Sequence, residues 1–124
     1  MPKASKATTT EHIEVPGYEG HTSDLGGITV AWESYTADTD LAPMLVGLPD
    51  DRCQSEHWGY VFEGKILFHT AEGDEEFTAG EAYYVRPGHT PVLFAGSSVV
   101  EFSPTDKLQQ TVEVVMRNMK AAGG

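Results

Sequence analysis

The residue types best suited to chemistry in this 124-residue sequence lie close together, in a segment that begins at Asp51. Asp51, Cys53 and His57 are all odd-numbered, and alternate side chains of a strand face the same side. If the segment is extended, we expect these three side chains to converge. A thiolate with imidazoles suits Zn²⁺, whereas imidazoles with oxygen ligands suit Ni²⁺, Fe²⁺ or Mn²⁺. The spacing therefore indicates a candidate site for a divalent metal, with Zn²⁺ as the first choice.

The spacing between this segment and the glycine that follows it matches a known motif. Counted back from Gly64, the segment resembles the first motif of the cupin superfamily, which has two histidines one residue apart, then a glutamate, then a glycine. On this alignment Asp51 and Cys53 stand at the two histidine positions, and His57 stands at the glutamate position. The resemblance is to a small single-domain cupin whose metal-binding motifs are degenerate.

A second stretch matches the second cupin motif in its glycines. Gly80 and Gly88 stand at the glycine positions, but Pro91 occupies the position of the motif's histidine. His89 has the same parity as Pro91 and lies two residues before it, so we expect it to reach the same cavity. The resemblance thus implies Cys53, His57 and His89 as metal ligands, with Asp51 or water as a fourth.

Each of the three ligands also has a structural interpretation. A lone cysteine is often a small buried hydrophobic residue, and a single cysteine cannot form an internal disulfide. His57 can hydrogen-bond a backbone carbonyl inside the barrel, and His89 can cap a turn beside Gly88. Three further histidines have no motif support and are expected on the surface or in packing contacts: His12, His21 and His69.

The elements that must position these residues are mostly strands. Short β-prone segments alternate with glycine-containing turns, as is typical of an all-β sandwich or barrel. We expect a disordered leader over residues 1–10 and one β-barrel domain over residues 11–103. The cupin resemblance implies that this barrel is a double-stranded β-helix, or jelly roll.

The end of the chain changes to a helical period, which predicts an amphipathic helix over residues 104–121. Ser103 is expected as the N-cap, with Pro104 at the first helical position and an acid, Asp106, in the first turn. The predicted apolar stripe recurs every three or four residues: Leu108, Val112, Val115 and Met119.

Composition and charge exclude several classes of partner. The chain has 19 acidic and 8 basic residues, a net charge of −11, so we expect no binding to nucleic acid or to a membrane surface. It has no apolar run long enough to span a bilayer. The first residues lack the apolar region of a signal peptide, which predicts a cytoplasmic location.

Three aromatic side chains share the parity opposite to His57. Trp58, Tyr60 and Phe62 are therefore expected to point out of the barrel. This stripe exceeds what a soluble monomer normally exposes. It must be covered by the terminal segments or by a second subunit, and we expect a homodimer.

Two classes of function follow from the resemblance. The first is a binding protein with a polar, metal-binding pocket for a small organic molecule. The second is a metal-dependent isomerase, lyase or dioxygenase, in which Asp51 or Glu56 serves as the catalytic base. The missing histidine of the second motif favours the binding protein, and the sequence leaves open whether the protein is an enzyme.

Overall fold

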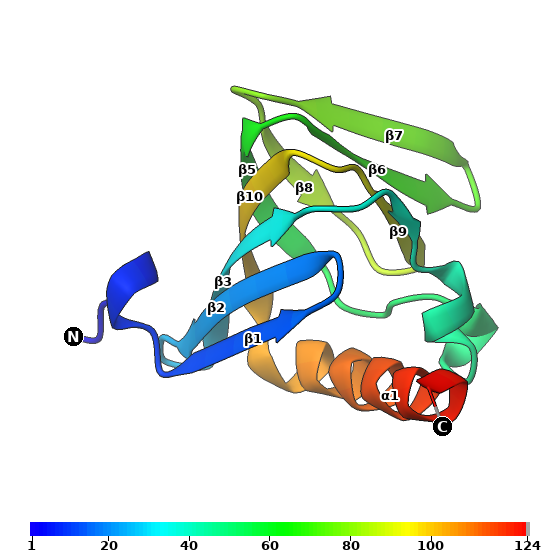
Figure 1. Ribbon diagram of the computed structural model, residues 1–124, viewed down its shortest axis with the longest axis horizontal. Helices are drawn as coiled ribbons and strands as arrows, with labels where there is room; N and C mark the ends of the chain where they lie inside the picture. The colour runs from blue at the N-terminus through cyan, green and yellow to red at the C-terminus, as the bar shows by residue number, and fades with distance from the viewer. Residues whose placement is uncertain (124) are drawn as a thin grey trace.

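A computed structural model describes residues 1–123 and contains two antiparallel sheets and one α-helix within that range (Figure 1). Three short 3-10 helices span Lys6–Thr8, Ala42–Leu45 and Pro49–Asp51, and α1 spans Thr105–Gly123. The strands are β1 (Glu11–Val15), β2 (Tyr18–Asp24), β3 (Ile28–Tyr35), β4 (Thr39–Asp40), β5 (His57–Glu63), β6 (Lys65–Thr70), β7 (Gly73–Thr78), β8 (Ala82–Val85), β9 (His89–Leu93) and β10 (Ser97–Pro104).

The two sheets enclose a barrel in which neighbouring strands are often distant in the sequence. The larger sheet has the order β1-β2-β3-β10-β5-β8, and the smaller sheet has the order β4-β9-β6-β7. β10 pairs with both β3 and β5, so the last strand lies between an early and a central one. The predicted all-β, jelly-roll type of barrel with a C-terminal helix is confirmed.

The core lies between the two sheets and is built by strict alternation along the strands. In β5, Val61 is fully buried, whereas Tyr60 and Phe62 are 40% and 48% exposed. The predicted inward and outward parity of this strand is therefore correct. The buried apolar side chains of this core are Tyr35, Val61, Ile66, Phe68, Tyr83, Val85, Leu93 and Val99.

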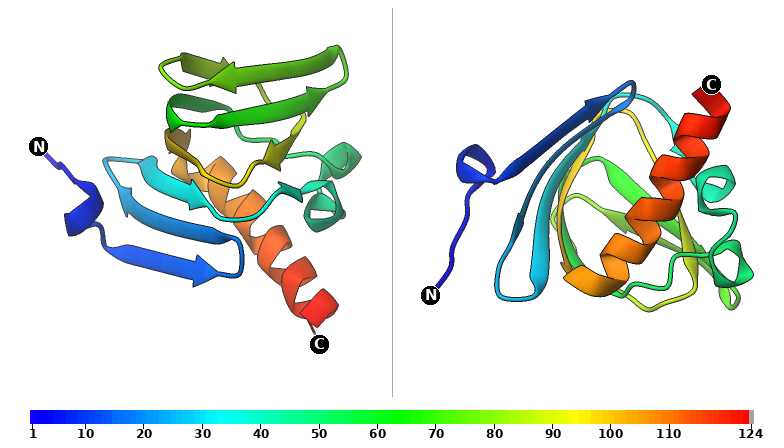
Figure 2. Two further views of the ribbon diagram at one scale, coloured as in Figure 1. Left: turned by 45° about the horizontal axis from the view of Figure 1, so that its top comes forward. Right: turned by 90° about the horizontal axis from the view of Figure 1, so that it is seen from below.

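Helix α1 lies across one end of the barrel (Figure 2). It begins at Thr105, because β10 continues to Pro104. Ser103 is therefore a strand residue and not the predicted N-cap, and its side chain is buried in the barrel. The buried face of the helix is centred on Thr111 and Val114 rather than on Val112, which is 40% exposed.

Two further features concern the predicted leader and the possibility of a membrane-spanning helix. Within the predicted leader, Lys6–Thr8 forms an exposed 3-10 helix whose cap is Ser5. Among residues 1–123, no helix combines the length and apolar character that crossing a membrane requires.

Candidate metal centre

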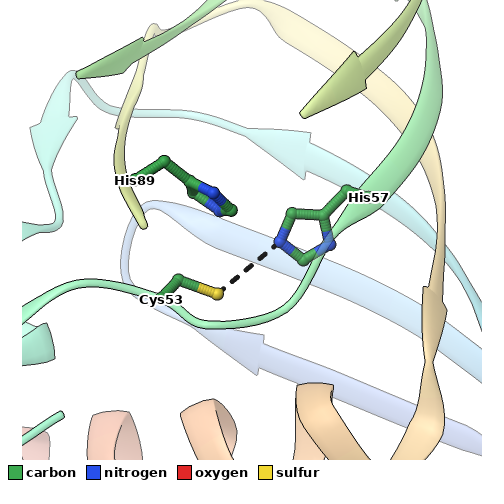
Figure 3. A group of neighbouring side chains, drawn as sticks. All are labelled: Cys53, His57 and His89. Atoms are coloured by element: carbon green, nitrogen blue, oxygen red, sulfur yellow. Dashed lines mark hydrogen bonds between the residues drawn. The ribbon is translucent and has the colours of Figure 1, made fainter. Parts of the chain in front are cut away.

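Cys53, His57 and His89 meet inside the barrel, where they form what we call the metal-ligand group (Figure 3). Their ligand atoms all lie within 4.8 Å of one another, and all three residues are at most 5% exposed. His57 is the first residue of β5 and His89 the first of β9. Cys53 is held beside them because its N–H donates to the His89 carbonyl at 2.9 Å.

The hydrogen bonds of His89 leave one ring nitrogen free. Its Nδ1 lies 2.7 Å from the Arg86 carbonyl oxygen, and since a carbonyl only accepts, Nδ1 carries the hydrogen. Nε2 then carries a lone pair, is buried, and has no hydrogen-bond partner in the described chain. Buried polar atoms without a partner are rare, so this nitrogen is suited to a ligand.

His57 lies between the metal-ligand group and a second set of polar side chains. Its Nε2 is 3.7 Å from Cys53 Sγ, and its Nδ1 is 2.6 Å from Ser103 Oγ. Burial lowers the pKa of both His57 and His89 to about 4. Both imidazoles are therefore neutral at pH 7, as metal ligation requires.

The thiol of Cys53 connects this group to the helix. Its Sγ lies 3.2 Å from the hydroxyl oxygen of Thr111 on α1. Burial raises the pKa of the thiol, so the free group is protonated at neutral pH. A coordinated cation reverses this preference, because a thiol that binds a metal is deprotonated.

The donor set of the group fits a borderline divalent metal. Two neutral imidazoles and one thiolate are typical zinc ligands, and three protein ligands leave a fourth position open. The unpartnered Nε2 of His89 is the structural observation that supports the fit.

Asp51 does not join this group, although the parity argument expected it to. It is exposed, and its Oδ1 accepts a hydrogen bond from the Gly47 N–H at 3.0 Å. The reason is local backbone conformation. Pro49–Asp51 forms a 3-10 helix in which Asp50 and Asp51 have φ values of +55° and +56°, so the period-2 alternation of a strand does not apply.

Glu56 also lies apart from the metal-ligand group. Its carboxylate accepts a hydrogen bond from the Tyr84 hydroxyl at 2.9 Å, an exposed contact. Tyr84 lies on the outer face of β8 and is 50% exposed.

The carboxylate that does approach the group is Glu101, which the sequence analysis missed. Its Oε1 lies 3.7 Å from His57 Nδ1, and its side chain is 12% exposed. The Tyr83 hydroxyl donates to its other oxygen at 2.6 Å. Burial raises the pKa of Glu101 to about 7.

A second, partly buried acid, Glu33, stands on the neighbouring strand β3. It accepts hydrogen bonds from the hydroxyls of Tyr18 at 2.5 Å and Tyr35 at 3.4 Å. Burial, and then the proximity of Glu101, raise the pKa of Glu33 to about 8. We call these five residues the carboxyl cluster: Tyr18, Glu33, Tyr35, Tyr83 and Glu101.

A sequence signal for these acids existed. Glu101 interrupts the apolar strand Val99–Phe102, and it shares the odd parity of Val99, a core residue. Likewise, Glu33 shares the parity of the buried Tyr35. An acid at a core-facing position of a strand needs a hydrogen-bond partner. Such a position therefore indicates a polar group inside the barrel.

Two surface hollows lie outside the metal-ligand group. One, of about 300 Å³, is lined by residues of β6, β7 and β8 and by Arg86; Phe68, in its wall, packs edge-on against the His89 ring at 5.2 Å. A second, of about 410 Å³, lies beside the β1–β2 turn and includes Tyr18. None of the three metal-ligand residues lines either of these two hollows.

Comparison with solved structures shows which proteins share this fold. An RmlC-like cupin from Shewanella frigidimarina is 16% identical, with a TM-score of 0.55, and the match covers 82% of this chain and 88% of that one. Ectoine synthase from P. lautus is 15% identical, with a TM-score of 0.56, covering 84% and 78%. A protein of unknown function from Rhizobium leguminosarum is 17% identical, with a TM-score of 0.58, covering 83% and 94%.

At these identities the shared property is the fold, and the chain is a small cupin-type barrel with a candidate metal site. No known family model matches the sequence, and no curated protein matches it.

Proposed function

We propose that this cupin-fold protein binds a divalent metal, Zn²⁺ first among the candidates, through Cys53, His57 and His89. The observation that carries the proposal is the buried, unpartnered Nε2 of His89, a residue that offers one of three ligand atoms within 4.8 Å of one another. When bound, the ion would supply a Lewis acid for a polar group of a small organic ligand.

The surrounding residues of the chain hold the two imidazoles in position. The Arg86 carbonyl orients the His89 ring, and Ser103 orients the His57 ring. Such partners of metal-bound histidines set the tautomer and the ring direction. Thr111 brings α1 against Cys53 and excludes water from that side.

A metal-dependent isomerase, lyase or dioxygenase is the second candidate. The observation that favours it is the contact of Glu101 with His57, because an enzyme of these classes needs a group that moves a proton. The roles predicted for Asp51 and Glu56 gain no support from their positions. Turnover of a substrate that is lost in Glu101→Gln, with metal content retained, would favour the enzyme.

The experiment that tests the metal proposal is elemental analysis of protein purified without added metal. After dialysis that removes weakly held metal from the surface, we expect about one zinc per chain in the wild type and its loss in His89→Ala. His69→Ala is the matched control, because His69 is exposed and pairs with Asp74 at 2.6 Å. A wild-type protein that binds no Zn²⁺, Ni²⁺, Fe²⁺ or Mn²⁺ even after each is added would overturn the proposal.

We also propose a homodimer formed through the outer face of the larger sheet. Large aromatic side chains on that face are 39–50% exposed: Trp58, Tyr60, Phe62, Tyr84 and Phe102. Neither β1 nor α1 covers them within the chain, which supports cover by a second copy. Light scattering should give twice the chain mass, and Phe62→Glu should give the monomer mass; a wild-type monomer at high concentration contradicts the proposal.

The cytoplasmic location is also a proposal, which fractionation of cells would test.

A further inference from the structure

A second cluster of metal-binding residue types lies outside the barrel, on the hairpin of β1 and β2. His12 and His21 are direct partners in the register of the two strands. Glu19 lies two residues before His21 on the same strand, and therefore on the same face. The three ligand atoms lie within 4.8 Å of one another.

This face points away from the interior. Tyr18 and Glu19 are neighbours on β2, and the Tyr18 hydroxyl reaches the buried Glu33 inside the barrel. Since neighbouring side chains alternate, Glu19 and His21 point outward. Their side chains are 34% and 21% exposed, and that of His12 is 50% exposed. The cluster therefore shares no residue with the metal-ligand group of Cys53, His57 and His89.

The two rings are arranged as a pair around one carboxylate. Their centroids are 4.3 Å apart and their planes differ by 15°. His21 Nε2 lies 3.2 Å from one oxygen of Glu19, and His12 Nε2 lies 3.7 Å from the other. Both nitrogens thus face the same carboxylate, which is the arrangement that a shared cation would need.

The geometry points to a second metal site, built by His12, Glu19 and His21 on the outer face of the β1–β2 hairpin. Two imidazoles and a carboxylate suit Zn²⁺, Ni²⁺ or Cu²⁺, whereas Mg²⁺ and Ca²⁺ prefer oxygen ligands alone. Water completes the coordination, because the site is open to solvent.

The charge around the hairpin favours a cation. Glu14 is the register partner of Glu19, and the chain as a whole carries a net charge of −11. A surface of this sign raises the local concentration of divalent ions. A site held by a register pair on adjacent strands also needs little rearrangement to bind.

The test is a Zn²⁺ titration of the metal-free, full-length protein, followed by NMR of the histidine side-chain nitrogens. We expect His12 and His21 to shift together, and His69 to stay unchanged. His69 is the internal control, since it is an exposed histidine paired with a carboxylate but lacks a second imidazole. Equal responses of His69, His12 and His21, or no response of the pair, would overturn the assignment.

Two variants separate this site from the metal-ligand group. His12→Gln keeps the size of an exposed side chain, so the protein should fold; binding at the hairpin should weaken by more than about tenfold, because a ligand is lost. His89→Ala should leave the hairpin shifts unchanged. With Co²⁺ in place of Zn²⁺, only the site that contains Cys53 can give thiolate absorption. If the hairpin binds the metal but no thiolate absorption appears, the result contradicts the interior site and leaves the hairpin site standing. If the thiolate absorption appears but the hairpin histidines do not shift, the result contradicts the hairpin site and leaves the interior site standing.

Discussion

Two groups of buried polar side chains lie side by side in the barrel, and they complete their hydrogen bonds differently. In the carboxyl cluster, Tyr18 and Tyr35 donate to Glu33, and Tyr83 donates to Glu101. In the metal-ligand group, His89 Nε2 has no partner within the described residues. The first group is complete without a ligand, and the second is not. Burial alone therefore does not mark a binding site; a convergent set of donor atoms with one left free does.

The two groups meet at a single contact, between His57 and Glu101 at 3.7 Å. This arrangement makes their roles separable by mutation. Substitutions in the metal-ligand group should change the metal content, and substitutions in the carboxyl cluster should change the pH dependence of stability. A substitution of His57 should change both.

The largest effect is expected for His57→Ala. Removing the ring deletes a proposed metal ligand and leaves a cavity beside Ser103 and Glu101, which then lose a neighbour. We expect loss of the metal and a fall of about 2–4 kcal/mol in the free energy of unfolding of the metal-free protein. Metal analysis and urea unfolding measure the two effects. A variant that keeps its metal would show that His57 is not a ligand.

A somewhat smaller effect concerns pH and tests the carboxyl cluster through Glu33→Gln. The pKa of Glu33 is about 8 in the folded chain against an ordinary 4.5. Above pH 4.5 the unfolded chain therefore releases a proton that the folded chain retains, and stability falls as pH rises until folded Glu33 also ionises near pH 8. The wild type should lose about 1–3 kcal/mol between pH 5 and pH 9, and the variant should lose less.

The control for this experiment is built into the comparison. His57 and His89 have lowered pKa values, about 4, so their contribution is lost as pH falls from 6.5 through 4. This loss of stability occurs below pH 6.5 in both the wild type and Glu33→Gln. The difference between their stability curves at higher pH therefore reports on Glu33. Identical slopes above pH 5 would show that Glu33 is ionised in the folded state.

Glycines opposite the two acids allow a third test. Gly59 pairs with Glu101 and Gly20 pairs with Glu33 in the sheet register. A Cβ on Gly59 would collide with the Tyr83 ring, and one on Gly20 would come within 2.5 Å of the Tyr18 hydroxyl oxygen. Each tyrosine thus lies over a glycine.

We expect Gly59→Ala to destabilise the protein by about 1–2 kcal/mol through this overpacking, with metal content unchanged. Gly20→Ala should cost less, because Tyr18 is only half-buried and can shift. Thermal unfolding of the two variants measures the difference. Equal, negligible effects would mean that the tyrosines move freely.

The sequence predicted the barrel and the convergence of Cys53, His57 and His89 because local spacing could be combined with the resemblance to the two cupin motifs. Glycine turns define the strands, and parity from His57 predicts which side chains of β5 face inward. The position of Asp51 was not predictable by this argument, since its left-handed backbone conformation breaks the alternation.

The carboxyl cluster was harder to predict because it depends on long-range pairing. Glu33 and Glu101 become neighbours only when β3 pairs with β10, and that register joins segments far apart in the sequence. The same applies to Ser103, whose helix-capping pattern was local and whose actual partner, His57, lies on β5.

Cys53→Ser is expected to have the smallest effect on folding and is the most selective test of the metal-ligand group. Serine keeps the size of the side chain and can still bond to Thr111, so the free energy of unfolding should change by less than about 1 kcal/mol. Cys53 has no direct contact with the carboxyl cluster among the described hydrogen bonds, so the slope of stability between pH 5 and about pH 8, below the range in which a thiol ionises, should match the wild type.

Zinc affinity should nevertheless weaken in Cys53→Ser, because a hydroxyl is a poor substitute for a thiolate at a zinc site. We expect a loss of about tenfold or more, equivalent to about 1.4 kcal/mol or more, measured by competition with a chelator. If Cys53→Ser keeps full affinity while His57→Ala loses it, the thiol only packs against α1, and the ion is held by the two imidazoles with oxygen ligands.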